Sequence, residues 1–182
     1  MSRAIPAAEP IETPRLTLRP AAAADIGRMV AEISDPAVAR MLARVPWPYR
    51  RRDAEAFLAS VAATTGRDLP LAIVLDGRLI GGIGLSGIRG EREFGYWLGR
   101  DHWGKGYATE AGRAFLAHVF NTFGAGPVNS GVFVDNPASM RVQAKLGFEK
   151  VGVSMRQCLA RGRPVEHIDT ILTRERFESL NP

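Results

Sequence analysis

One strand–loop–helix–strand segment, residues 93–134, constrains the fold of this chain more than any other part of its sequence. Residues 93–98 alternate like a β-strand, and a glycine-rich stretch follows them. Apolar residues then recur at helical spacing over 108–123, and Gly124 is expected to end the helix. A second strand is predicted at 128–134. This order predicts a right-handed crossover between two parallel strands.

The remaining patterns predict a mixed α/β fold in which most strands are antiparallel. The apolar runs 71–75 and 79–88 meet at Asp76-Gly77, which favours a hairpin because a type I′ turn needs positive φ at both central residues. The other expected elements are strands at 15–19, 150–155 and 167–172, a helix from an Asp25 N-cap to Ile33, a helix at 52–63, and a last helix between an Asn136 N-cap and Gly147. The central sheet should hold about seven strands flanked by helices.

Composition favours a single domain spanning residues 1–182. The chain is 46% hydrophobic and 24% charged, which suits one globular core. Residues 1–12 read as a flexible N-terminal tail without the continuous apolar segment of a signal peptide. No stretch approaches the roughly 20 apolar residues that a membrane helix needs. We therefore expect a cytoplasmic protein that does not bind membranes.

The charge balance leaves the partner open, and the possible metal-ligating residues argue against a metal site. The net charge of +5 comes from basic residues that are scattered apart from Arg50, Arg51 and Arg52, so a solvated surface is the first expectation, phosphates of a cofactor the second, and nucleic acid is less favoured. Cys158 is the only cysteine, and His102, His118 and His167 lie far apart without ligand-like spacing. We expect neither a disulfide nor a metal site.

The loop 99–110 has the composition of a phosphate site. Gly104 and Gly106 flank Lys105 and allow backbone N–H groups to converge, while the following helix start adds unpaired donors and a positive dipole end. The alternative is a plain strand-to-helix turn. Gly106 also stands where a nucleoside-triphosphate loop needs Ser or Thr. Gly82, Gly84 and Gly87 have dinucleotide-loop spacing, but a strand follows them, so they predict close approach of a neighbour instead.

These motifs resemble a known family. Residues 103–111, Trp-Gly-Lys-Gly-Tyr-Ala-Thr-Glu-Ala, together with 93–98 and 136–148, are similar to the acetyl-coenzyme A signature of the GNAT N-acetyltransferases, in the branch of RimJ and RimL. The resemblance covers nearly the whole chain. It implies a GNAT-like sheet with a splayed parallel pair, and direct transfer of acetyl from acetyl-CoA to an amine in a ternary complex. Trp103 departs from the superfamily's Gln or Arg at the first loop position.

The resemblance also implies the cofactor-binding residues. The pyrophosphate is expected on backbone amides of the loop, and the pantetheine arm beside the strand at 96–98 and Asn136. The full set is Tyr96, Trp97, Leu98, Gly104, Lys105, Gly106, Tyr107, Ala108, Thr109 and Asn136. Two members have structural alternatives: Lys105 can point to solvent, and Asn136 before a proline is an ordinary helix cap.

The expected catalytic residues are Glu93 and Ser139. Glu93 is the candidate base that takes the amine proton, although a solvated strand-end charge is the alternative. Ser139 is the candidate acid for the leaving thiolate, because Gln143 stands at the helical position where many family members have tyrosine. Glu110 is expected to support the helix dipole. Cys158 is not expected to relay the acyl group.

The acceptor is expected between the 71–88 hairpin, the first two helices and the C-terminal strands. Trp47 and Tyr49 lie near this region, and core packing is their expected role. A protein N-terminus and a small-molecule amine both remain open as acceptors, and so does a homodimer. The alternative functions are a non-catalytic acyl-CoA-binding sensor and a nucleic-acid-binding accessory protein.

Overall fold

A computed structural model describes residues 9–63, 66–88 and 90–181 of the chain. It contains one sheet of eight strands in the order β1-β2-β3-β4-β5-β6-β8-β7. The strands are β1 (Ile11–Glu12), β2 (Thr17–Arg19), β3 (Leu69–Leu75), β4 (Arg78–Ser86), β5 (Arg92–Leu98), β6 (Val128–Phe133), β7 (Glu149–Cys158) and β8 (Arg163–Leu172). All neighbours are antiparallel except β5 and β6, which confirms the predicted fold class.

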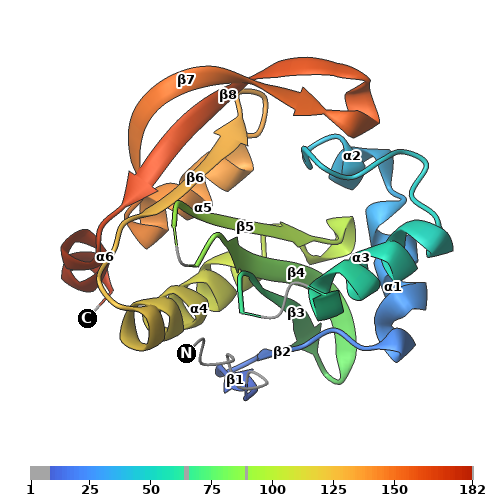
Figure 1. Ribbon diagram of the computed structural model, residues 1–182, viewed down its shortest axis with the longest axis horizontal. Helices are drawn as coiled ribbons and strands as arrows, with labels where there is room; N and C mark the ends of the chain where they lie inside the picture. Colours follow the sequence, from blue (N-terminus) through green and yellow to red (C-terminus); the bar gives the residue numbers. More distant parts are fainter. Residues whose placement is uncertain (1–8, 64–65, 89, 182) are drawn as a thin grey trace.

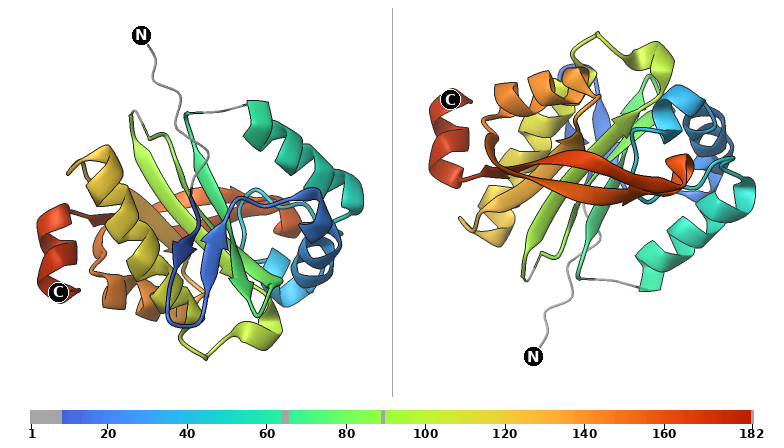
Figure 2. Two further views of the ribbon diagram at one scale, coloured as in Figure 1. Left: turned by 90° about the horizontal axis from the view of Figure 1, so that it is seen from below. Right: turned by 90° about the horizontal axis from the view of Figure 1, so that it is seen from above.

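Helices cover both faces of the sheet (Figures 1 and 2). The α-helices are α1 (Ile26–Ile33), α2 (Pro36–Ala39), α3 (Arg51–Ala63), α4 (Tyr107–Phe123), α5 (Pro137–Leu146) and α6 (Arg174–Leu180). The larger core joins one sheet face to α4, α5 and α6, with Phe115 and Leu116 fully buried. A smaller core packs Met29 of α1 and Ala54 of α3 against β3 and β4 on the other face. In the described part of the chain, no helix is long and apolar enough to cross a bilayer.

The hairpin between β3 and β4 forms as predicted. Asp76 and Gly77 both have positive φ, at 48° and 75°, as a type I′ turn requires. Further along β4, Gly82 faces Trp97 of β5, and a Cβ at Gly82 would lie 2.5 Å from the indole Nε1. The expected close approach at these glycines is therefore confirmed, and it gives the Trp97 ring its place.

The β5–α4–β6 unit supplies the parallel pair, but the two strands separate almost at once. Only Arg92 and Glu93 of β5 pair with β6, opposite Val128 and Asn129. Beyond them the strands diverge, while β6 continues to pair with β8 up to Phe133. The structure therefore has the splayed pair that the family resemblance implies.

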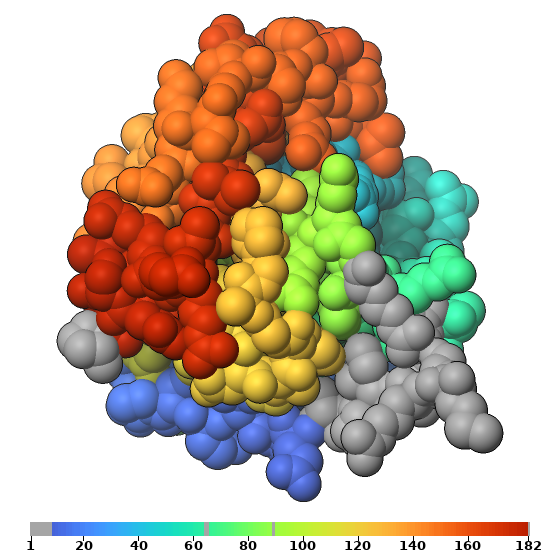
Figure 3. All heavy atoms as spheres, turned by 60° about the vertical axis from the view of Figure 1, so that its left-hand side comes forward, coloured from blue at the N-terminus to red at the C-terminus, as the bar shows by residue number. Residues whose placement is uncertain are grey.

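Two short elements near the ends of the described chain differ from the prediction. Ile11 and Glu12, assigned to the flexible tail, form β1 against β2, because the Thr13–Leu16 turn folds the chain back. Helix α6 was missed; Thr173 caps it and Phe177 packs on Phe120 with ring centroids 5.5 Å apart. Figure 3 shows α6 (red) on the surface beside the end of α4.

Helix α2 and the role of Asp25 also differ. Pro36 does not merely follow α1 but opens α2, because Asp35 accepts a hydrogen bond from Ala37 N and proline suits a first helical position. Asp25 does not use its side chain to cap α1. Its carboxylate instead pairs with both terminal nitrogens of Arg19, at 2.7 and 3.0 Å, and accepts from Ala22 N.

The β7–β8 arm reaches across to the segment that follows α2 (Figure 1). Leu159 N donates to Ala43 O at 3.0 Å, and Arg161 Nε donates to Arg40 O at 2.7 Å. Asp135 accepts from both Arg40 and Arg161. These bonds fix the arm above the splayed end of the sheet.

Candidate active site

The loop before α4 presents a row of unpaired backbone donors. Gly104 and Gly106 have φ of 74° and 83°, a region that glycine enters without a steric penalty. In the described residues nothing accepts from the N–H groups of Gly104, Lys105 or Gly106. The first turn of α4 adds the N–H groups of residues 107–109, which have no partner within the helix. This geometry suits an anion such as a pyrophosphate.

The N-terminal segment contributes to this loop, which the sequence reading missed. The guanidinium of Arg15 donates to Lys105 O at 3.1 Å and lies 4.6 Å from the centre of the Tyr107 ring. A Cβ at Gly106 would stand 3.4 Å from Arg15 Nη2. Arg15 therefore places a positive charge beside the unpaired amides. Nothing in the pattern around residue 15 indicated this contact.

The gap between β5 and β6 exposes backbone groups of β5. Ser130 Oγ donates to Phe94 O at 2.8 Å, and Trp103 Nε1 donates to Leu98 O at 2.8 Å. Since alternate residues of a strand point their backbone groups to the same edge, Tyr96 also faces the gap, between these two bonds. Trp103 therefore ties the loop to the end of β5. Of the residues expected beside the pantetheine arm, Tyr96 offers the open N–H and C=O.

Two hydroxyls meet at one side of the gap. Tyr96 Oη and Ser139 Oγ lie 2.7 Å apart, and either can donate. Burial raises the pKa of Tyr96 to about 12, with the hydrogen bond to Ser139 opposing it, so the phenol is protonated at neutral pH. Asn136 Oδ1 accepts from Ser139 N at 3.1 Å, which confirms the predicted helix cap. Within the described chain, no partner is found for Asn136 Nδ2.

Gln143, at the position where many relatives have tyrosine, is a buried structural residue. Its Nε2 donates to Ser130 Oγ at 2.8 Å, and its Oε1 accepts from Thr170 Oγ1 at 2.7 Å. These bonds join α5 to β6 and β8. The amide is therefore already engaged by the protein.

One continuous cleft of about 1250 Å³ joins the loop to the opposite side of the sheet. Gly104, Thr109 and Ser139 line its one end, and α1, α3 and β4 line the other. The expected acceptor region therefore borders the cleft. Tyr49 is buried as expected, and burial and the charge of Asp53 raise its pKa to about 12. Trp47, expected in the core, is instead 50% exposed, with its Nε1 donating to Ser34 O.

Glu93 lines the cleft, but both of its oxygens are engaged. Arg156 Nη1 stands 2.8 Å from Oε1, and Arg44 Nη2 stands 3.2 Å from Oε2. Glu110 lies elsewhere, at the N-terminal segment, and accepts from Thr13 and Arg15. Its structural role is thus a tether as well as a charge at the helix start.

Other reactive groups do not form a second centre. Cys158 is fully buried, and its Sγ lies 3.6 Å from Arg40 O and 3.5 Å from Leu42 O. In the residues that are described, no three His, Cys, Asp or Glu side chains are grouped to hold a metal ion.

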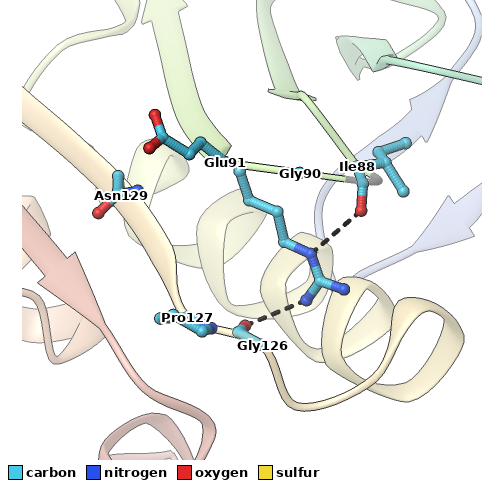
Figure 4. A pocket seen from close by; sticks show the side chains of 7 residues that line it. Ile88, Gly90, Glu91, Gly126, Pro127 and Asn129 are labelled. Carbon is cyan, nitrogen blue, oxygen red and sulfur yellow. Dashed lines mark hydrogen bonds between the residues drawn. The ribbon is translucent and has the colours of Figure 1, made fainter.

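A second cavity, of about 410 Å³, lies at the paired end of β5 and β6. Arg92 borders it and donates to Ile88 O at 3.4 Å and Gly126 O at 3.0 Å, the bonds drawn in Figure 4. The same guanidinium donates to Gly124 O at 2.9 Å and to Phe123 O. Its role is therefore to satisfy carbonyls at the C-terminal end of α4.

Known proteins are similar to this chain in sequence and in fold. Residues 15–149 match the acetyltransferase (GNAT) domain family. The chain is 29% identical over 174 residues to the N-acetyltransferase p20 of Bacillus licheniformis, covering 92% of this chain and 98% of p20. The RimJ structure of Mycobacterium smegmatis, in complex with CoA-disulfide, superposes with a TM-score of 0.79 at 23% identity over 92% of this chain and 87% of its own.

A second solved structure has the same fold. The spermidine N-acetyltransferase of Vibrio cholerae, in complex with CoA and spermine, superposes with a TM-score of 0.78 at 18% identity over 90% of this chain and 98% of its own. RimL is also among the structural neighbours. Combined with the splayed strands and the amide-lined loop, the family match identifies the chain as an acetyltransferase of the GNAT family.

Proposed function

We propose that this protein transfers an acetyl group from acetyl-CoA to a primary amine of a protein N-terminus or a small molecule, in a ternary complex. The observation that carries the proposal is the continuous cleft, which runs from the unpaired amides of the loop through the gap between β5 and β6. A donor on one side of the sheet and an acceptor on the other would meet in this gap. Acetyl-CoA is a cytoplasmic metabolite, so we place the protein in the cytoplasm.

The donor would bind along residues of both strands and the loop. Its pyrophosphate would accept hydrogen bonds from the N–H groups of residues 104–109, beside the charges of Arg15 and Lys105. Its pantetheine arm would pair with the free backbone of Tyr96, as a peptide adds to a sheet edge. Asn136 Nδ2 would reach the same arm. Trp97 and Leu98 would shape the walls, since the Leu98 carbonyl already accepts from Trp103.

Two structural neighbours support CoA as the donor group and leave the acceptor class open. RimJ was crystallised with CoA-disulfide, and the Vibrio cholerae enzyme with CoA and spermine. RimL is named as an acetyltransferase of a ribosomal-protein α-amine. This fold therefore serves both protein and polyamine acceptors, and both belong in the test.

The chemistry needs one proton removed from nitrogen and one delivered to sulfur. The paired hydroxyls of Tyr96 and Ser139 would supply the second, with Ser139 facing the cleft. Glu93, which also lines the cleft, is one candidate to take the first proton. Its contacts with Arg44 and Arg156 would compete with that proton for the carboxylate oxygens.

The direct test is incubation with acetyl-CoA and a panel of peptides with free N-termini, polyamines and small amines, followed by mass spectrometry. A product that gains one acetyl group supports the proposal. Stabilisation by acetyl-CoA without turnover of any amine would instead indicate a non-catalytic acyl-CoA sensor. Salt-dependent binding to nucleic acid without donor binding would indicate the accessory-protein alternative.

A further inference from the structure

A histidine and an aspartate on β8 form a hydrogen-bonded pair near the gap. His167 Nδ1 lies 2.8 Å from Asp169 Oδ1, and the two residues share a strand face because they are two positions apart. Ser154 on β7 donates to the same oxygen at 3.0 Å. One carboxylate oxygen therefore receives two donors from neighbouring strands.

This arrangement fixes the tautomer of the imidazole. Burial alone would raise the pKa of Asp169, but the hydrogen bonds from His167 and Ser154 and the charge of Arg156 outweigh it, so the pKa lies below its usual value. An ionised carboxylate only accepts hydrogen bonds, so Nδ1 must carry the proton. Nε2 of the neutral ring is then left with a free lone pair.

The ring stands at the opening between β5 and β6. His167 pairs with Phe133 in the sheet and lines the cleft, although its side chain is only 9% exposed. Its Cε1 lies 2.2 Å from where a Cβ of Gly131 would be, so the ring covers Gly131. Gly131 is the second residue after Asn129, the last β6 residue that pairs with β5. Phe133 packs edge-on against the ring, with centroids 5.7 Å apart.

The two candidate bases, His167 and Glu93, differ in whether their proton-accepting atoms already have partners. Among the described residues, no hydrogen-bond partner is found for Nε2, and it is not a buried unsatisfied atom. The charged groups around the ring are Asp169 on β8, Arg156 on β7, Glu93 on β5, and the Arg161–Asp135 pair beyond Phe133. Glu93 has a guanidinium at each oxygen, so a substrate proton would compete there with Arg44 and Arg156.

We propose that His167 is the general base of the reaction and that Asp169 is its positioning residue. The inference rests on the proposed function. The acceptor nitrogen forms the new bond to the acetyl carbon and gives its proton to Nε2. The carbon–sulfur bond breaks with its electron pair on sulfur, which takes a proton from the Tyr96–Ser139 pair. Water in the cleft then removes the proton from His167 and restores the hydroxyl pair.

The test compares His167→Gln, Asp169→Asn and the control His118→Gln with wild type, using an amine that wild type acetylates. General-base loss lowers kcat by about 100-fold or more in His167→Gln, with unchanged acetyl-CoA stabilisation in a melting assay. In Asp169→Asn, kcat should fall by at least about tenfold, because the asparagine amide donates to Nδ1 of His167 and the ring proton moves to Nε2. His118 lies on α4 outside the cleft lining, so its variant should match wild type.

Two further readouts separate catalysis from folding. In wild type, kcat/KM should fall at low pH because the base becomes protonated, and this dependence should be missing from His167→Gln. Added imidazole should restore turnover to His167→Ala. Nitrogen-15 NMR of the wild-type ring should show the Nδ1–H tautomer, and Asp169→Asn should shift it.

Wild-type rates in folded His167→Gln, or the same fall of kcat/KM at low pH in this variant, would overturn the assignment of the base and leave the proposed function intact. The Nε2–H tautomer in wild type would overturn it as well. Failure of wild type to acetylate any amine in the panel would instead overturn the proposed function, and the inference with it.

Discussion

Glu110, on the first turn of α4, accepts hydrogen bonds from both the backbone N–H and the side-chain Nε of Arg15, a residue 95 positions earlier in the chain. Thr13 Oγ1 adds a third bond at 2.7 Å. The carboxylate therefore connects the N-terminal segment to the loop that carries the unpaired amides. It also sets the position of the Arg15 guanidinium, which lies against Lys105 and Tyr107.

Glu110→Gln should destabilise the protein and weaken donor binding. Losing charged hydrogen bonds costs about 1–3 kcal/mol in the free energy of unfolding. Burial opposes ionisation of Glu110, but the bonds from Thr13 and Arg15 outweigh it, so its pKa lies below the ordinary 4.5. Its stabilisation is therefore complete above 4.5 and is lost as the pH falls through the folded-state pKa.

Denaturation of both proteins at neutral pH and at several values below 4.5 measures this difference. The difference in the free energy of unfolding between wild type and Glu110→Gln should become smaller as the pH is lowered. Glu178→Gln is the control, because the exposed Arg174–Glu178 pair on α6 is worth no more than about 0.5 kcal/mol. A difference that grows at low pH would contradict the role given to Glu110.

Gly106→Glu should abolish stabilisation by acetyl-CoA. The substitution puts a carboxylate among the amides proposed to hold the pyrophosphate, and it strains a residue with φ of 83°. Gly162→Glu is the matched control: Gly162 has φ of 63° and open space around its Cβ position, but it does not line the cleft. Without acetyl-CoA, both variants should be less stable than wild type. Addition of acetyl-CoA should raise the melting temperature of Gly162→Glu but not that of Gly106→Glu.

Asn136→Asp should separate the two roles of this residue. Asp and Asn cap helices about equally well, so the free energy of unfolding should change by less than about 0.5 kcal/mol. The Nδ2 donor is lost, however, and KM for acetyl-CoA should rise. Asn136→Ala should lose both the helix cap and the Nδ2 donor, and the lost cap should lower the free energy of unfolding by about 1 kcal/mol. An unchanged KM in Asn136→Asp would limit this residue to capping α5.

Ser139→Ala should lower kcat by about tenfold, less than the roughly 100-fold or more typical of an acid catalyst, because a thiol of pKa about 8.5 is already a fair leaving group. Tyr96→Phe should have a similar effect. If the 2.7 Å hydroxyl pair acts as one unit, the double variant should be no slower than the slower single one. Rates from single-turnover mixing test this, with Ser179→Ala on α6 as control. Fully additive losses would show that the two hydroxyls act separately.

Sequence patterns predicted the elements whose signals are local. The Asp76-Gly77 turn, the helical spacing before Gly124 and the Asn136 cap each depend on residues close in sequence. The short elements β1, α2 and α6 carried weak signals, since two to seven residues leave little periodicity to detect. Helix α6 also depends on a distant contact, because Phe177 packs on Phe120 of α4.

The candidate site divides in the same way. The loop 104–109 was found from its glycines, because glycine is the residue that readily adopts the positive φ such a loop needs. The contribution of Arg15 and the His167–Asp169 pair was not found, because strand pairing brings those residues to the site from distant positions. The partners of Glu93 were hidden for the same reason: Arg44 and Arg156 come from opposite ends of the chain.

The early separation of β5 from β6 has a consequence for the protein without its donor. Among the described residues, two pairs join β5 to β6, so the rest of this edge of β5 has no strand beside it. In the proposed binding mode, the pantetheine arm would pair with the free backbone of Tyr96 in this opening. Amide hydrogen exchange at Tyr96 should then slow when the donor binds, because the bound arm would lie where a neighbouring strand is missing.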